Sequence, residues 1–411
     1  MKTVLITAYA VNPFKGSEDG TGWNIVKEIS KEFRVILITR KNNIQHLDRY
    51  FSLEEPTLKD RIEYHGFDLS DWVLKLKKRS GTKGHVGYFY LWQKAIIGFL
   101  KKRSFEFSAS MSLNFHSDSH PHFLWKLGKP CIWGPIGHHP RIPRSFVLKA
   151  YGFRAYFIDR LFFHAKWLLR NVNPAFRRAV RKSERIFVIN SSIRSTIGAP
   201  ESKTIRLPAV AAKKVLTRKS ASSKSFTVLC AGRFHFMKGF DVALESFLTF
   251  VEHLPPVERQ RVRLILVGKG PEKEVLRKIA DSSEYSESIK WIEWVEHSEM
   301  DELYATSDIF LFPSHEGAGM VIPEAMSHGV PALTFKNVGP GELIGINELT
   351  VEYQDYRSSI LDFASKLLEF YLDRPKLTQL KRQVKEKHAE SLTWEVKGEI
   401  IRNELNEILK N

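Results

Sequence analysis

The sequence predicts an α/β protein of two domains, each built on a parallel β-sheet. Short apolar runs rich in Val, Ile and Thr alternate with stretches of helical character, which is the pattern of strand–helix–strand units in parallel sheets. A polar, basic segment interrupts this alternation once, at residues 211–225, and the alternation then restarts. With 411 residues, the chain is also longer than one hydrophobic core usually supports.

The first half of the chain contains three strand candidates. Two of them, TVLITAY (3–9) and RVILITR (34–40), flank a helical stretch, GWNIVKEISKEF, and the third is RIFVIN (185–190). This arrangement predicts a Rossmann-like domain over residues 1–210. The segment 211–225 is rich in Ser and Ala as well as basic residues, which is typical of a linker.

The second half repeats the pattern. Its strand candidates are FTVLCAGR (226–233), VRLILVGKG (262–270) and SDIFLFPSH (307–315), and the first is followed by a helical stretch, FDVALESFLTFVEHL. They predict a second Rossmann-like domain over residues 226–385. Ligands of open α/β sheets bind at the carboxyl ends of the strands, so we expect the two domains to face each other across a cleft that holds the ligand.

The C-terminal segment, 386–411, is predicted to contain an amphipathic helix. Its apolar residues recur at helical spacing, at Val396, Ile400, Ile401, Leu405 and Ile408. A helix of this kind has one face to bury against another element.

Composition excludes several classes of protein. Hydrophobic residues make up 43% of the chain, which is enough for a large core and too much for a disordered protein. No apolar run approaches the ~20 residues of a membrane-spanning helix, and the N-terminal run is too short for a signal peptide. Cys131 and Cys230 match no metal-ligand spacing. We therefore expect buried, reduced thiols, no metal site and a cytoplasmic location.

Positive charge is concentrated in the first half of the chain. Residues 1–210 hold 36 Lys and Arg against 16 Asp and Glu, whereas the remainder holds 27 against 30. Within residues 141–185, twelve Lys and Arg interleave with nine aromatic residues at roughly helical spacing. Such helices bind anionic membrane surfaces. The alternative is that the aromatic residues pack in the core and the cations are only solvated; no nucleic-acid-binding module is visible.

Two cations follow the first strand of the second half. Arg233 ends that strand, and Lys238 lies five residues further on, just before a helix. Arg donates in a bidentate fork and Lys acts as a point charge, so the pair suits a diphosphate; the alternative is two solvated surface cations. A Gly-rich turn, VGKGP (267–271), follows the next strand and by itself carries little information.

The stretch PSHEGAGMVIPEAMSHGVP (313–331) combines two glycines with two glutamates. Gly317 and Gly319 allow a ligand to approach the backbone closely, and a helix is predicted to follow. Glu316 and Glu324, eight positions apart, can bracket a ligand, with one carboxylate on sugar hydroxyls and the other on a ribose. The alternative makes Glu316 a loop anion and Glu324 a first-turn residue favoured by the helix dipole.

These motifs resemble those of a known family. GRFHFMKG (232–239) followed by EGAGMVIPEAMSHGVP (316–331) resembles the donor-binding half of the retaining glycosyltransferases of family 4. These group 1 type enzymes of cell-surface polysaccharide biosynthesis have the GT-B fold, and their signature includes two glutamates separated by seven residues. KGSEDGTGW (15–23) resembles the glycine-rich loop of one branch of the family, and LGKPCIWGPIG (127–137) resembles a WGP segment of the same branch.

The resemblance implies a role for each matching residue. Arg233 and Lys238 would neutralise the departing diphosphate, Glu316 would hold the donor sugar and Glu324 the ribose. Further donor-site positions are Gly16, Gly232, Gly317, Ala318, Gly319, Met320 and Val321. The resemblance also implies a nucleotide sugar as co-substrate, no metal or other cofactor, same-face displacement with retention, and a C-terminal helix that packs on the N-terminal domain.

Histidines depart from the family pattern. Family members commonly carry a histidine just after a strand of the N-terminal half, close to the donor sugar, but Met111 and Ser112 stand at about that place here. His116 is the nearest histidine, and it either takes that catalytic role or lies in a surface loop. His138 and His139 either line the acceptor side or form an exposed loop pair.

The predicted function is transfer of a hexose from a nucleotide-diphosphate sugar to a saccharide or lipid-linked saccharide acceptor in surface polysaccharide or glycolipid synthesis. We expect a peripheral protein on the inner face of the cytoplasmic membrane and no nucleic-acid partner. Two alternatives stay open. One is a non-catalytic membrane- or polyanion-binding protein on the same scaffold, and the other is a nucleotide-sugar epimerase, which would need further acid–base carboxylates.

Overall fold

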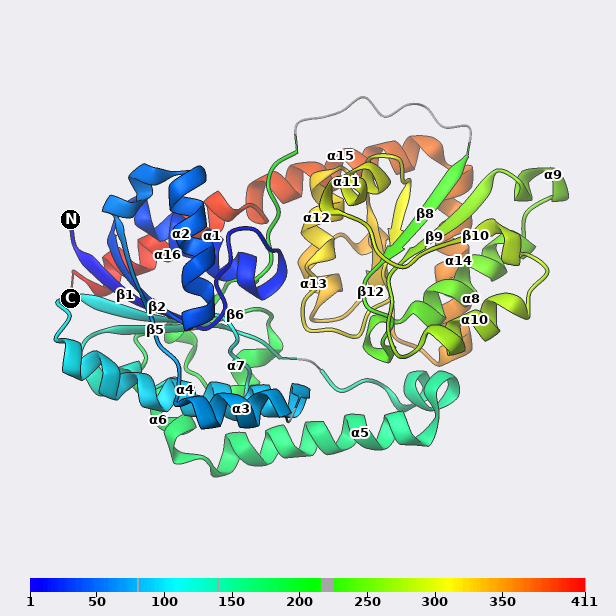
Figure 1. Cartoon of the computed structure of the whole chain (residues 1–411). Coiled ribbons are helices and arrows are strands. Elements are labelled where there is room, and N and C mark those ends of the chain that lie inside the picture. Colours follow the sequence, from blue (N-terminus) through cyan, green and yellow to red (C-terminus); the bar gives the residue numbers. More distant parts are fainter. Residues whose placement is uncertain (80, 139, 216–224, 411) are drawn as a thin grey trace. The chain divides into compact units, whose positions relative to one another are not determined.

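The computed structural model describes residues 1–79, 81–138, 140–215 and 225–410. The chain divides into two compact units, each with its own sheet (Figure 1). The first unit comprises Met1–His138, His164–Val210 and Trp394–Asn411, and the second comprises His139–Phe163 and Ala211–Thr393. The boundaries differ from the predicted ones because residues 139–163 belong to the second unit. Residues 216–224 of the predicted linker lie outside the described residues.

The described part of the first unit contains a parallel sheet of seven strands in the order β3-β2-β1-β4-β5-β6-β7. The strands are β1 (Thr3–Ala8), β2 (Arg34–Thr39), β3 (Ile62–Gly66), β4 (Ala109–Leu113), β5 (Cys131–Ile136), β6 (Arg185–Val188) and β7 (Thr204–Arg206). Strands β1, β4 and β5 are buried almost throughout, which explains their continuous apolar runs. The strand order reverses between β1 and β4, where sheets of this type bind ligands.

The helices of the first unit are α1 (Ser17–Ser30), α2 (Lys41–Leu53), α3 (Asp71–Arg79), α4 (Gly81–Arg103), α6 (Pro174–Lys182), α7 (Ser192–Ile197) and α16 (Trp394–Ile408). The C-terminal helix α16 packs on α1. Arg402 of α16 bonds the Glu28 carboxylate at 3.1 Å, and a Cβ on Gly398 would lie 2.3 Å from Cβ of Glu28. Of its predicted apolar residues, three are buried, namely Ile401, Leu405 and Ile408. The other two, Val396 and Ile400, are half-buried.

The second unit contains a parallel sheet in the order β10-β9-β8-β11-β12-β13. Its strands are β8 (Phe226–Ala231), β9 (Val262–Val267), β10 (Ile289–Ile292), β11 (Ile309–Leu311), β12 (Ala332–Phe335) and β13 (Thr350–Val351). Its helices are α8 (Phe240–Glu252), α9 (Pro256–Arg259), α10 (Lys273–Asp281), α11 (His297–Ala305), α12 (Val321–Ser327), α13 (Pro340–Ile344), α14 (Tyr356–Leu372) and α15 (Arg374–Ser391). Here the strand order reverses between β8 and β11.

Helix α5 (Arg144–Val172) is long and bends at Gly152, whose φ of 75° is the left-handed conformation that glycine tolerates. Its residues up to Phe163 belong to the second unit and those from His164 to the first. Its N-terminal part docks on the second unit through Phe146, whose ring packs 5.2 Å from that of His315 and 5.3 Å from that of Phe335. This packing explains why residues 139–163 group with the second unit.

Both cysteines are free and buried, as predicted. Burial raises the pKa of Cys131 to about 12 and also raises the pKa of Cys230, so neither thiol ionises readily. Within the described ranges, no helix combines the length and apolar character needed to cross a membrane.

Candidate functional site

The loops after β8, β9 and β11 meet at the carboxyl edge of the second sheet. A Cβ on Gly268, which has a φ of +155°, would lie 1.9 Å from the carbonyl oxygen of Gly232, and a Cβ on Gly270 would lie 2.2 Å from that of Phe234. The Gly-rich turn after β9 therefore needs its glycines in order to pack against the loop after β8. The Phe234 amide also donates to the Lys269 carbonyl at 3.0 Å.

The loop after β8 is joined in turn to the loop after β11. The His315 amide donates to the Met237 carbonyl at 2.8 Å, and the Ser314 hydroxyl donates to the same oxygen at 3.1 Å. Gly239 has a φ of +67°, and a Cβ there would lie 2.0 Å from the Pro313 carbonyl oxygen. These contacts fix the two loops at the point where the strand order reverses.

The consequence of this junction is a close pair between Lys238 and Glu316. Nζ of Lys238 lies 2.7 Å from Oε2 of Glu316, and the side chains are 20% and 16% exposed. The Ser314 hydroxyl donates to the same carboxylate oxygen at 3.3 Å, and the Lys238 ammonium lies 5.3 Å from the centre of the Phe312 ring. A half-buried pair of this kind interacts more strongly than one on the open surface.

Arg233 lies exposed on the loop that carries Lys238. Between them, His235 accepts a hydrogen bond at Nδ1 from the Met237 amide at 3.3 Å. Burial, followed by the charges of Arg233 and Lys238, lowers the pKa of His235, so the imidazole is neutral near pH 7. The loop thus presents the two basic side chains of Arg233 and Lys238 at the sheet edge.

Glu324 lies in α12, as predicted, and contacts a different partner from Glu316. The Tyr304 hydroxyl donates to its Oε2 at 3.3 Å. Burial raises the pKa of Glu324 above its ordinary value, and burial together with the Glu324 charge raises the pKa of Tyr304. The two glutamates therefore offer carboxylates at two separate places, before and within α12.

The glycine stretch between the two glutamates is tightly packed at Gly319. A Cβ at this position would lie 3.2 Å from the side chains of Phe312 and Ile322. Helix α12 begins after it, at Val321, and has only seven residues, so we assign no anion-binding role to its dipole.

In the first unit, the stretch 15–23, which was predicted as a loop, forms the start of α1 from Ser17 onward, and it has two kinds of glycine. A Cβ on Gly20 would lie 2.4 Å from the Lys15 carbonyl oxygen, and one on Gly22 would lie 2.1 Å from that of Ala10. Gly16, by contrast, is exposed, has an ordinary φ of −82° and has no atom within 4 Å of a built Cβ. The packing of the described residues therefore explains Gly20 and Gly22 but not Gly16.

His116 is buried, so the surface-loop alternative is wrong. Its Nε2 lies 2.9 Å from the Ser112 hydroxyl, and its Nδ1 has no hydrogen-bond partner within the described part of the chain. Burial, followed by the neighbouring His122 and His120, lowers the pKa of His116 well below its ordinary value. The imidazole is therefore neutral. His138 is also buried, so it is not an exposed loop residue, and His139 lies outside the described residues.

Residues 213–387 match the family described as glycosyl transferases group 1. This match covers most of the second unit but not its residues 139–163, and it includes both loops that carry Lys238 and Glu316. This part of the chain is therefore similar to the group 1 glycosyl transferases.

Curated proteins similar to this chain include a GDP-mannose-dependent monoacylated alpha-(1-6)-phosphatidylinositol monomannoside mannosyltransferase from Corynebacterium glutamicum. It is 28% identical over 208 residues, which cover 48% of this chain and 51% of the relative. The chain spans about half the length or less of the curated relatives that it matches first.

Solved structures show that the whole chain has the GT-B fold. Anabaena HepE in complex with UDP and glucose superposes with a TM-score of 0.61 at 15% identity, covering 99% of this chain and 100% of that one. A glycosyltransferase from Rickettsia africae superposes with a TM-score of 0.63 at 14% identity, covering 100% and 99%. At these identities the likeness concerns the fold alone.

Sequence reasoning missed one residue that supports the candidate site. Asn337, after β12, donates to the Ser314 carbonyl at 2.8 Å and accepts from the Gly339 and Gly341 amides at 3.1 Å each. A Cβ on Gly339 would lie 1.8 Å from the carbonyl oxygen of Glu316. The only local signal is NVGPGE, a turn-forming run after a strand, and such runs are common.

Proposed function

We propose that this chain is a retaining, metal-independent hexosyltransferase of family 4 that takes its hexose from a nucleotide-diphosphate sugar. The observation that carries the proposal is the contact between Lys238 and Glu316 at 2.7 Å, at the point where the strand order of the second sheet reverses. It brings a phosphate-binding cation and a hydroxyl-binding carboxylate together, as the donor requires where its diphosphate meets its sugar.

The positive charge of the site acts on the leaving group. When the bond from sugar to phosphate breaks, negative charge grows on the diphosphate, and Lys238 and exposed Arg233 stabilise it. Fixed cations that need no reorganisation lower the barrier most effectively. We expect these two residues to supply the charge that a divalent metal supplies elsewhere. Backbone groups at Gly232 and along the stretch 317–321 contact the same donor.

The two glutamates hold the two sugars of the donor. Glu316, beside Lys238, accepts hydrogen bonds from hydroxyls of the transferred hexose, and Glu324, oriented by Tyr304, accepts from the ribose. Retention follows if the acceptor attacks the face that the diphosphate leaves, with the departing phosphate taking the acceptor proton. No covalent sugar intermediate is then needed.

In the first unit, Gly16 and buried His116 are the two residues that we assign to the donor. No atom lies within 4 Å of a Cβ built on Gly16, so packing among the described residues does not explain a glycine at this position. This supports close approach of a ligand. His116 has an unpaired, neutral Nδ1 among the described residues, which supports a hydrogen bond to the donor sugar.

We place the acceptor at a membrane. The alternative that the aromatic residues of 141–185 all pack in a core is contradicted by α5, on which several large apolar side chains are exposed: Phe153, Phe157, Leu161, Phe162, Trp167, Leu168, Leu169 and Val172. Together with the twelve cations of this segment, they suit an anionic membrane surface. The chain would then work as a peripheral protein on the cytoplasmic face, on a lipid-linked saccharide of surface polysaccharide or glycolipid synthesis.

A thermal-shift screen against UDP, GDP, ADP, CMP and their sugar conjugates tests the donor site. A ligand at ~100 times its dissociation constant stabilises the folded state by about 2.7 kcal/mol. One nucleoside diphosphate should raise the melting temperature of the natural protein and not that of Lys238→Ala. If none raises it, the non-catalytic binding protein becomes the better interpretation, and turnover of a nucleotide sugar without any acceptor would favour the epimerase.

A further inference from the structure

Two cations meet on one tyrosine at the carboxyl edge of the first sheet. Tyr9 follows β1 and is 2% exposed, Arg40 follows β2, and Lys77 lies near the end of α3. Nζ of Lys77 donates to the Tyr9 hydroxyl at 3.0 Å, and the guanidinium carbon of Arg40 lies 4.9 Å from the centre of the Tyr9 ring. Asp68, in the segment after β3, completes the group, and we call these four residues the Tyr9 cluster.

The carboxylate of Asp68 offsets only part of the charge of Arg40. Nε of Arg40 lies 3.8 Å from Oδ1 of Asp68, which is an ion pair but too long for a hydrogen bond. The carboxylate receives its hydrogen bonds from other groups, the Tyr88 hydroxyl at 2.7 Å and the Lys41 amide at 3.0 Å. The Nε atom of Arg40 is buried and has no hydrogen-bond partner among the described residues. This donor therefore lacks an acceptor.

Lys77 is buried without a counter-ion. In the described part of the chain it forms no ion pair, and the only hydrogen bond of its side chain is the one to Tyr9. Its ammonium otherwise contacts aromatic rings, 4.7 Å from the centre of the Tyr88 ring and 5.4 Å from that of Tyr9. Burial, followed by the charge of Arg40, lowers the pKa of Lys77 to about 8, so the side chain is still mostly protonated at pH 7. A bound anion would offset the unfavourable burial of this charge.

The charges around Lys77 leave an excess of positive charge. Arg40 and Lys77 carry two positive charges against the one negative charge of Asp68, and Lys78 adds a further positive charge close by. His85, on α4, adds none near pH 7, because burial, followed by the charges of Lys77 and Arg40, lowers its pKa. Two like charges held against one side chain repel each other, and an anion that contacts both would remove this repulsion. The cluster therefore suits an anionic group.

The Tyr9 cluster lies beside His116, which we assign to the donor sugar. The centre of the Tyr9 ring lies 5.2 Å from that of Phe89, and the centre of the Phe89 ring lies 5.5 Å from that of His116. Phe115, directly before His116, also packs on Tyr9, with 5.0 Å between the ring centres. An anion on the cluster would thus lie one layer of aromatic rings away from the place that we assign to the donor sugar. The donor diphosphate already has Lys238 as its cation, so this anion belongs to the other substrate, the acceptor.

We propose that the Tyr9 cluster binds an anionic substituent of the acceptor sugar, a carboxylate or a phosphate ester, through Arg40 and Lys77. This rests on the proposed function and adds the chemical class of the sugar that accepts the hexose, an acidic one. The planar guanidinium of Arg40, whose side chain is 21% exposed, donates to two oxygens of such a group, and the Lys77 ammonium supplies a point charge. Tyr9 holds Lys77 in position through its hydroxyl.

Binding of soluble sugars to the full chain tests this assignment. The probes are glucose, galactose and mannose, each as the neutral sugar, the uronic acid and the 6-phosphate, so that the members of a series differ only at carbon 6. In at least one series a charged form should bind about tenfold more tightly than the neutral sugar in titrations followed by NMR. Lys77→Met and Arg40→Gln should each weaken the charged form about tenfold, as expected for the loss of one charge-assisted bond. Lys101→Met, which removes an exposed lysine of α4, is the matched control and should change nothing.

The relative affinities of the uronic acid and the 6-phosphate then identify the group as a carboxylate or a phosphate. Equal affinity for charged and neutral sugars in all three series, or charged sugars that bind both variants as tightly as the natural protein, would overturn the proposal. If inorganic phosphate or acetate binds as tightly as the charged sugars, the cluster is a site for a bare anion and the saccharide assignment is wrong. If a soluble prenyl phosphate binds and no charged sugar does, the anion belongs to a lipid link and the proposal is equally wrong.

Two further measurements keep the test decisive. Circular dichroism melts show whether each variant folds, and because Lys77 and Arg40 lie on different elements, one variant remains informative if the other does not fold. The nucleotide-induced thermal shift of both variants should match that of the natural protein, since neither residue is assigned to the donor. Loss of charged-sugar binding with this shift intact supports the proposal. Absence of the shift in the natural protein itself would instead count against the donor site, which separates the two failures.

Discussion

Lys238 and Glu316 are 78 positions apart in the sequence, yet Nζ of the lysine lies 2.7 Å from Oε2 of the glutamate. Different strand ends carry them, and the bond from the His315 amide to the Met237 carbonyl holds those ends together. His315 is itself anchored, because its Nδ1 lies 2.7 Å from the Tyr353 hydroxyl and its ring stacks on that of Phe335. The pair is thus positioned by the fold and not by its own attraction alone.

Replacing Lys238 by alanine should lower turnover about a hundredfold to a thousandfold, because one preorganised charge at the leaving group is lost. The fold should persist, since Glu316 keeps partial contact with water and the Ser314 hydroxyl. Initial rates with a nucleotide sugar and circular dichroism melts measure the two effects. Lys336→Ala, which removes an exposed ion pair with Glu352, is the control and should leave turnover unchanged. Near-normal turnover in Lys238→Ala would show that the assignment of Lys238 to the donor diphosphate is wrong.

Replacing Glu316 by glutamine should lower turnover of the sugar donor while affinity for the bare nucleoside diphosphate stays the same. The amide keeps the size of the side chain but loses the charge that sugar hydroxyls favour. Glu324→Gln should instead weaken binding of the bare nucleoside diphosphate, because we assign this carboxylate to the ribose. Calorimetric titration of both variants with nucleotide and with nucleotide sugar distinguishes them. If Glu316→Gln also binds the bare nucleoside diphosphate more weakly, the assignment of Glu316 to the sugar and Glu324 to the ribose is wrong.

Replacing Gly339 by alanine should displace the loop that carries Glu316, although Gly339 itself is not assigned to the donor. The added Cβ would lie 1.8 Å from the carbonyl oxygen of Glu316, so the loop with this glutamate must move. The φ of Gly339 is −97°, outside the left-handed region, so the expected effect rests on this steric clash. We expect a loss of stability of about 1–3 kcal/mol, as for overpacking, together with a loss of turnover. Gly98→Ala, where a built Cβ meets nothing within 4 Å, is the control for urea unfolding and rate measurements.

The parallel strands and the donor loops could be predicted from the sequence because their signals are local. Buried strands such as β1 and β8 appear as continuous apolar runs, and Lys238, Glu316 and Glu324 stand in a motif with fixed spacing. The place of residues 139–163 could not be predicted. The aromatic residues Phe146 and Phe157 look alike in the sequence, but the first is buried against His315 and the second is exposed.

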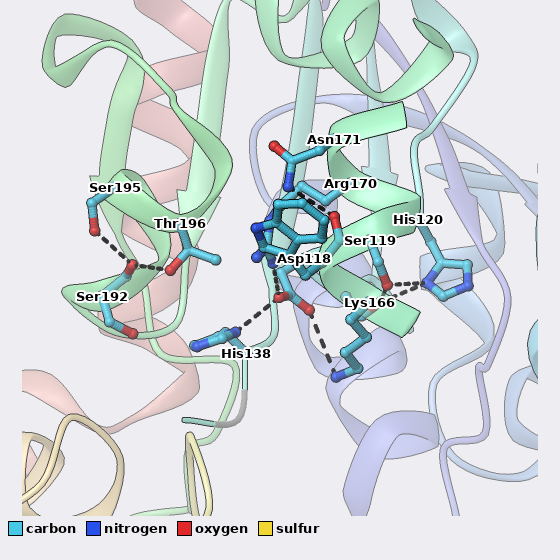
Figure 2. A network of polar contacts seen from close by, with 12 residues as sticks. Asp118, Ser119, His120, His138, Lys166, Arg170, Asn171, Ser192, Ser195 and Thr196 are labelled. Atoms are coloured by element: carbon cyan, nitrogen blue, oxygen red, sulfur yellow. Dashed lines mark hydrogen bonds and ion pairs between the residues drawn. The ribbon is translucent and has the colours of Figure 1, made fainter. Parts of the chain in front are cut away.

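The charged side chains that surround Asp118 were equally invisible in the sequence (Figure 2). These residues come from the loops after β4 and β5 and from α5, and no spacing rule joins positions 118, 138, 166 and 170. Only the neighbouring strands β4 and β5 bring the two loops together, through the bond from the Asp118 amide to the Gly137 carbonyl at 3.0 Å. Contacts set by tertiary packing leave no periodic trace in the sequence.

Asp241, just after Lys238 in the second unit, should make stability fall as the pH rises from about 4 to 6. Burial raises the pKa of Asp241 to about 6, and hydrogen bonds from Tyr151 at 2.7 Å and Tyr356 at 3.1 Å oppose that rise. An unfolded aspartate ionises near a pKa of ~3.9, so the folded state binds more protons in this window. Relative to Asp241→Asn, the natural protein should lose about 3 kcal/mol of unfolding free energy as the pH rises from about 4 to 6.

Urea denaturation of both proteins at several pH values measures this difference. Tyr151→Phe is the matched variant, because it removes one donor to the carboxylate while it keeps the ring. It should raise the pKa of Asp241 further, so the fall in stability should extend to higher pH. A difference between natural protein and Asp241→Asn that does not vary with pH would show that Asp241 titrates as an exposed carboxylate does.

Lys397, on α16 of the first unit, should have the opposite effect on the pH dependence of stability. Its side chain is buried, and its Nζ donates to the Pro208 carbonyl. Within the described ranges no carboxylate forms an ion pair with it, and burial, followed by the charge of Arg206, lowers the pKa of Lys397 to about 7. The unfolded lysine keeps its proton up to a pKa of ~10.4, so between pH ~7 and ~10 the unfolded state binds more protons and stability rises with pH.

Lys397→Met isolates this effect because it keeps the length of the side chain and removes the charge. Relative to this variant, the natural protein should gain about 1.4 kcal/mol of unfolding free energy per pH unit between pH ~7.5 and ~9.5. Lys410→Met, at the exposed end of the same segment, is the control for any general effect of lost positive charge. Equal pH dependence in the natural protein and Lys397→Met would mean that the ammonium reaches water in the folded state, and that α16 is held less closely to residues 204–210 than the buried contact implies.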